Sequence, residues 1–121
     1  MKVVRSVASA VAALVMLVAG SAVLDAHMKL EKSEPAANAV VAAPPATVQV
    51  FFSEEPDLKV SDLEIKGPGK VTLASVEAVE KSLKATVRGD VADGAYTVSW
   101  RAAGKDGHIQ KGEFVFTVKR K

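Results

Sequence analysis

After residue 26, the chain consists of short runs of alternating apolar and polar residues, and this pattern constrains its fold most strongly. In the runs 48–53 and 96–101, every second residue is apolar, as in a strand with one buried face. No stretch after residue 26 keeps the 3.6-residue period of a helix. Turn-forming groups separate the runs: Pro44-Pro45, Glu55-Pro56-Asp57, Gly67-Pro68-Gly69, Arg88-Gly89-Asp90, Asp93-Gly94 and Asp106-Gly107.

The number and spacing of these runs predict an all-β fold. With 29–33 as an edge strand, residues 27–121 hold seven strands, the others being 48–53, 60–65, 71–79, 83–87, 96–101 and 114–118. This count favours a seven-stranded, immunoglobulin-like Greek-key β-sandwich over a closed barrel. Tyr96 is either a tyrosine corner, whose hydroxyl bonds back to the preceding turn, or an ordinary core residue. Trp100 continues the same face and is expected in the core.

Composition excludes several classes of protein. The chain has 121 residues and no cysteine, which rules out disulfides, Cys-based zinc sites, thiol chemistry and a lipid-modified cysteine anchor. A net charge of +2, in a chain with 25% charged residues, makes no electrostatic case for nucleic-acid binding. The length after residue 26 suits a single domain.

Residues 1–26 have the layout of a secretory signal peptide. Lys2 and Arg5 form a positive start, and residues 6–24 carry no charge. An uncleaved membrane anchor is the alternative, because the apolar stretch is near the length that spans a bilayer. Cleavage after Ala26 would make His27 the first residue, whereas cleavage after Ala22 fits the preference for small residues better. We expect residues 1–26 to be the signal and residues 27–121 to be the exported domain.

The two histidines of the chain, His27 and His108, are candidate metal ligands. Once exposed by cleavage, His27 can chelate one ion through its α-amine and Nδ1. Asp106 precedes His108 by two residues, so that both side chains point to one side of an extended loop. Three nitrogens and one carboxylate oxygen suit Cu(II), which favours tetragonal N,O sites. Zinc prefers a tetrahedron, and nothing in the spacing proves that residues 27 and 108 meet.

The chain resembles the CopC family of periplasmic copper-binding, copper-resistance proteins. The residues that carry the resemblance are Ala26-His27, Leu30 to Pro35-Ala36, Ala43-Pro44, Phe52-Ser53-Glu54, Gly94 to Arg101, Asp106-Gly107-His108, Gly112 and Phe114 to Val118. The resemblance implies a Cu(II) site at one end of the sandwich, formed by His27, Asp106 and His108. The resemblance also implies that Glu54 is an outer ligand or accepts a hydrogen bond from one of the ligands. It also favours cleavage after Ala26.

Two features of the chain depart from the family pattern. Some members bind Cu(I) in a Met-rich loop, but residues 27–121 hold only Met28, so we expect no Cu(I) site of that kind. Met28 itself is expected to pack at the edge strand. Gly104 replaces a polar residue that often precedes the Asp-x-His turn, which puts the hydrogen bonding of this loop in doubt.

The leading hypothesis is a non-enzymatic, monomeric periplasmic protein that sequesters Cu(II) or carries it to an inner-membrane transporter. One alternative is a copper monooxygenase, which also uses an N-terminal histidine chelate but needs an open coordination position and exposed aromatic residues. The other is a sandwich module for protein–protein contact, in which the histidines have no common role.

Overall fold

A computed structural model describes residues 28–120, and its regular elements are almost all strands. The strands are Leu30–Glu34 (β1), Val40–Val41 (β2), Thr47–Phe52 (β3), Asp62–Lys66 (β4), Lys70–Val79 (β5), Ser82–Asp90 (β6), Gly94–Ala103 (β7) and Ile109–Val118 (β8). A 3-10 turn, η2 (Leu58–Val60), precedes β4. The predicted all-β class is confirmed. Within residues 28–120, no helix is long and apolar enough to cross a membrane.

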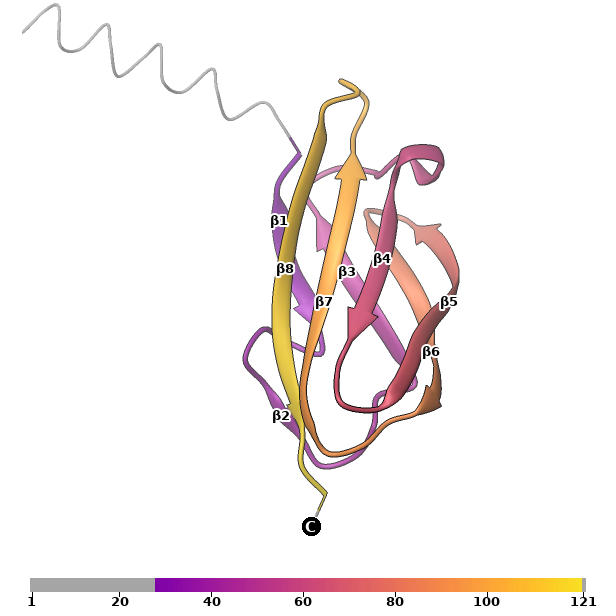
Figure 1. Cartoon of the computed structure of the whole chain (residues 1–121). Coiled ribbons are helices and arrows are strands. Elements are labelled where there is room, and N and C mark those ends of the chain that lie inside the picture. Colours follow the sequence, from indigo (N-terminus) through magenta and orange to yellow (C-terminus); the bar gives the residue numbers. More distant parts are fainter. Residues whose placement is uncertain (1–27, 121) are drawn as a thin grey trace, which may run out of the picture.

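The strands form two four-stranded sheets that face each other (Figure 1). The first has the order β1-β3-β6-β5 and the second the order β2-β8-β7-β4. Strands that are neighbours in a sheet are often distant in sequence, as in a Greek-key sandwich. All pairs are antiparallel except the short pair of β2 with β8.

The alternating residues of the strands fill the space between the sheets, as the sequence predicts. Val48, Val50 and Phe52 of β3 are buried, and so are Tyr96, Val98 and Trp100 of β7. The rings of Phe52 and Trp100 pack edge to face, with their centroids 5.3 Å apart. Because one face of β3 and one face of β7 are apolar, burying these faces against the opposite sheet stabilises the sandwich.

Tyr96 is a tyrosine corner, which decides between the two interpretations of this residue. Its side chain is fully buried, and its hydroxyl donates a hydrogen bond of 2.6 Å to the carbonyl oxygen of Ala92. The ring also stacks on that of Phe116, with centroids 5.6 Å apart. The bond ties the start of β7 to the turn that precedes it.

We expect Tyr96→Phe to lower the free energy of unfolding by about 1 kcal/mol, because this hydrogen bond is lost while the ring packing is kept. Urea denaturation of the variant and the parent measures the difference. Thr97→Val removes a hydroxyl on the opposite face of β7 and is the control, with a change within about 0.5 kcal/mol. Equal midpoints for Tyr96→Phe and the parent would contradict the prediction.

The strand count differs from the sequence prediction by one short element. The two-residue strand β2 was not expected, and it pairs in parallel with Thr117 and Val118 of β8. Such a strand has no period to detect, because two residues cannot show an alternation. The edge strand β1 begins at Leu30, one residue later than expected.

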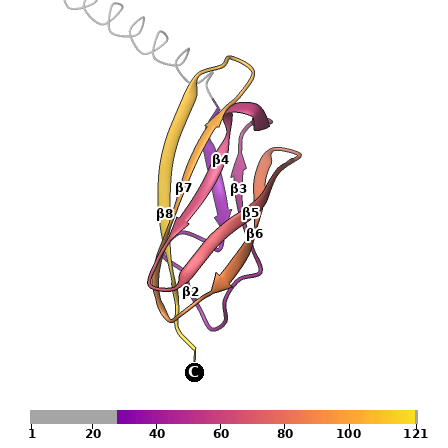
Figure 2. The same cartoon turned by 45° about the vertical axis from the view of Figure 1, so that its right-hand side comes forward.

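Several segments that are far apart in the sequence lie at one end of the sandwich. In both views, the start of β1, the turn η2 and the loop between β7 and β8 lie at the end opposite the C-terminus (Figures 1 and 2). Strand β3 also ends there, since Phe52 pairs with Leu30 at the start of β1. Residues from distant parts of the chain therefore meet at this end.

Candidate metal centre

The loop 104–108 joins β7 to β8 and brings Asp106 and His108 together. The backbone N–H of Gly107 donates a 3.1 Å hydrogen bond to the carbonyl oxygen of Gly104, which closes a turn. Gly107 has a φ of 76°, in the left-handed region that glycine adopts readily. This bond joins backbone atoms and needs no side chain at position 104.

Within this turn, Asp106 and His108 make two contacts. The backbone N–H of His108 donates to Asp106 Oδ1 at 3.1 Å, and His108 Nδ1 lies 3.5 Å from Asp106 Oδ2. The two side chains therefore share one side of the loop, as predicted. The reason differs from the prediction, because an Asx-type turn and not an extended segment brings them together. The His108 side chain is 70% exposed, so that its ring is accessible to an ion from solvent.

Glu54 lies at the base of the same loop. Its carboxylate packs on the backbone of Gly104, where a Cβ atom would overlap Glu54 Oε1 and lie 2.9 Å from its Cδ. A nearby backbone bond, from the N–H of Asp57 to the carbonyl oxygen of Ala103 at 2.8 Å, joins the segment after β3 to the end of β7. The structure thus places Glu54 beside the loop that carries the Asp-x-His sequence.

The first described residues are fixed beside Glu54. The backbone N–H of Lys29 donates to Ser53 Oγ, and that of Ser53 donates to the carbonyl oxygen of Lys29, both at 2.8 Å. Met28 is only 1% exposed and belongs to the core. The prediction that Met28 packs is confirmed, although it lies before β1. Sequence reasoning missed the role of Ser53, for which the Phe-Ser-Glu motif was the available signal.

The described residues alone do not form a complete metal site. Within residues 28–120, no three His, Cys, Asp or Glu side chains are grouped so that they could hold a metal ion. His27 lies outside the described residues. The structure therefore joins Asp106 to His108 and places Glu54 on Gly104, and it says nothing of His27.

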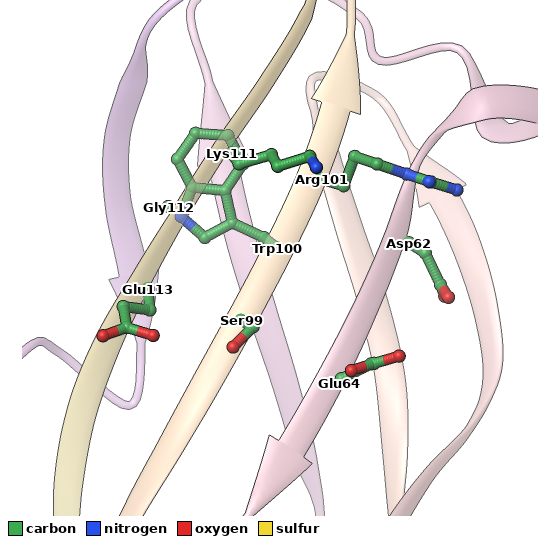
Figure 3. Close-up of a pocket in the computed structure, with 8 residues that line it drawn as sticks. All are labelled: Asp62, Glu64, Ser99, Trp100, Arg101, Lys111, Gly112 and Glu113. Carbon is green, nitrogen blue, oxygen red and sulfur yellow. The ribbon is translucent and has the colours of Figure 1, made fainter.

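Away from the loop 104–108, a groove of about 550 Å³ lies on the outer face of β4, β7 and β8 (Figure 3). Asp62 and Glu64 of β4, Ser99 and Arg101 of β7, and Lys111 and Glu113 of β8 line it. These charges have both signs, and no histidine is among the residues that line the groove. The groove thus lacks the nitrogen ligands that Cu(II) prefers.

The sequence and the structure are similar to those of known copper-resistance proteins. A family model described as the CopC domain matches residues 30–119. The copper resistance protein C of Escherichia coli is 36% identical over 117 residues, with 88% of this chain and 90% of that protein covered. The protein YobA of Escherichia coli (strain K12) is 34% identical over 99 residues, with 78% and 80% covered.

A solved structure agrees with these sequence relatives. The crystal structure of PcoC from Escherichia coli, described as a methionine-rich copper resistance protein, superposes with a TM-score of 0.65 and 34% identity. The match covers 78% of this chain and all of that one. The predicted family resemblance is thereby confirmed. The names of copper resistance protein C and of PcoC describe copper resistance and no enzymatic activity, in agreement with the prediction for this chain.

Proposed function

The chain belongs to the CopC family, and from this premise we propose that it is a periplasmic protein that binds Cu(II) for sequestration or delivery. The proposed ligands are the α-amine and imidazole of His27, the imidazole of His108 and the carboxylate of Asp106. Glu54 serves as an outer ligand or as a hydrogen-bond acceptor behind them. The proposed partner is an inner-membrane copper transporter, and the protein acts as a monomer.

The observation that carries this proposal is that the Asp106–His108 turn, Glu54 and Lys29, the residue before β1, lie at one end of the sandwich. His27 is joined to Met28 by one peptide unit, across which Cα atoms lie about 3.8 Å apart. Lys29 is hydrogen-bonded to Ser53, the neighbour of Glu54. These connections support the proposal that the amine of residue 27 contributes to a site at this end of the sandwich.

The chemistry of this set favours oxidised copper. Three nitrogens and a carboxylate suit the tetragonal preference of Cu(II), and divalent copper binds such ligands more tightly than the other first-row ions do. The sulfur of Met28, the single methionine of residues 27–121, is buried in the core and thus unavailable as a surface ligand. We therefore propose a Cu(II) site without a Met-rich Cu(I) site.

Export completes the proposed site. Removal of residues 1–26 would release the chain into the periplasm and turn the peptide nitrogen of His27 into an amine. The intact mass of the exported protein tests this directly, because cleavage after Ala22 would leave four additional residues, from Val23 to Ala26. The residues that the structure describes do not favour the monooxygenase alternative. Of the six aromatic side chains, all but Phe51 are buried, which leaves no broad aromatic surface for a substrate.

We expect His108→Ala to weaken Cu(II) binding by the processed chain by about 100-fold, close to 2.7 kcal/mol, because one of three nitrogen ligands is lost. Competition titration gives the affinity, and EPR reports the loss of a nitrogen from the copper plane. Gln110→Ala, which removes a neutral polar side chain two residues away, is the matched control and keeps the parent affinity. If His108→Ala and His27→Ala both bind copper as the parent does, the proposed function is wrong.

A further inference from the structure

The Glu54 carboxylate fills the space that a side chain at position 104 would need. The carboxylate of Glu54 lies where a side chain at position 104 would begin, so that a Cβ there would overlap Oε1. Gly104 is not among the residues with positive φ. The glycine therefore leaves room for the Glu54 carboxylate, and no positive φ calls for a glycine at this position.

This collision differs from those at other glycines. A Cβ on Gly69 or Gly89 would meet backbone atoms, and one on Gly112 would meet the buried ring of Trp100. Such collisions disturb the fold itself. At Gly104, the opposing atoms belong to the end of a flexible, half-buried glutamate, which can rotate away. A side chain at position 104 would thus move the carboxylate and leave the sandwich intact.

Gly104 also belongs to the turn that carries the proposed ligands. Its carbonyl oxygen accepts the hydrogen bond from Gly107 that closes the loop around Asp106. On the opposite side, Glu54 follows Ser53, which is hydrogen-bonded to Lys29. The carboxylate therefore lies against the backbone of Gly104 at the base of this turn, and the absence of a side chain at position 104 allows it to lie there.

We propose that Gly104 is a positioning residue, which keeps the Glu54 carboxylate against the loop and thereby tunes Cu(II) binding. This inference rests on the proposed copper function. Gly104 itself supplies no ligand. Its effect acts entirely through Glu54, because the displaced group is the glutamate carboxylate. Removal of a group that orients a metal ligand by a hydrogen bond changes metal affinity by about 10–100-fold.

A double-mutant cycle with Gly104→Ala and Glu54→Ala tests this role. In the processed parent chain, Gly104→Ala should weaken Cu(II) binding by about tenfold and change the EPR spectrum. In the Glu54→Ala background, the same substitution should have no effect, because no carboxylate is left to displace. The melting temperature of the metal-free Gly104→Ala variant should stay close to that of the parent. Glu113→Gln, on the outer face of β8, controls for the general loss of a carboxylate.

The outcomes separate this inference from the function on which it rests. If His108→Ala weakens binding but Gly104→Ala does not, the positioning role is overturned and the copper function stands. Equal effects of Gly104→Ala with and without Glu54 would also overturn it, because the substitution would then act through the loop alone. If no variant, His108→Ala included, changes copper binding, the proposed function itself fails and the role of Gly104 with it.

Discussion

The chain that begins at His27 is expected to bind Cu(II) about 100-fold more tightly than the full-length precursor, a difference near 2.7 kcal/mol. In the precursor, the nitrogen of His27 forms a peptide bond with Ala26, so that it has no free lone pair for a metal. Cleavage turns it into an amine with a pKa near 8, which a metal ion readily deprotonates. Competition titration of both forms under the same conditions measures the ratio.

A processed chain with an acetyl group on the α-amine of His27 is the control for this comparison. It keeps both imidazoles, the Asp106 carboxylate and the folded domain, and it lacks only the amine. We expect its affinity to match that of the precursor. Equal affinities in all three forms would show that the amine is no ligand, and the proposed N-terminal chelate would then be wrong.

Replacing Met28 by alanine is expected to lower the free energy of unfolding by about 2–5 kcal/mol. The side chain is 1% exposed and packs in the core directly before β1, so that truncation leaves a cavity between the sheets. For a domain of this size, such a loss lowers the melting temperature by more than about 5 °C. Thermal and urea denaturation of the metal-free protein measure the effect.

The conservative variant Met28→Leu distinguishes packing from chemistry. Leucine fills a similar volume and should cost less than about 1.5 kcal/mol. It has no sulfur, yet we expect it to bind Cu(II) as the parent does, since Met28 is not a proposed ligand. A large loss of copper affinity in Met28→Leu, with stability retained, would contradict the assignment of a site without methionine.

Local sequence patterns were sufficient for most of the fold. The alternation in 48–53 and 96–101 predicted which residues face the core, because successive side chains of a strand point to opposite faces. The same local reasoning predicted that Asp106 and His108 share one side of their loop. The expected loop conformation was wrong, since the left-handed conformation of Gly107 makes a turn there and not an extended segment. The short strand β2 was missed because its two residues are held by β8 and not by a pattern of their own.

The contacts around the candidate site could not be predicted in this way. Gly104 was recognised only as a departure from a family pattern, and its contact with the Glu54 carboxylate appears only in the structure. Likewise, the paired hydrogen bonds between Lys29 and Ser53 join residues far apart in the chain. No local propensity reports such contacts, because they depend on which strands become neighbours.

By itself, the sequence determined the all-β class, the buried faces of β3 and β7 and the cysteine-free, histidine-poor set of candidate ligands, since these depend on residue type and short-range period. Only the tertiary structure decided that the start of β1, the residues after β3 and the loop 104–108 meet at one end of the sandwich. The physical reason is that burying two apolar sheet faces against each other sets the strand order, and the strand order brings distant loops together.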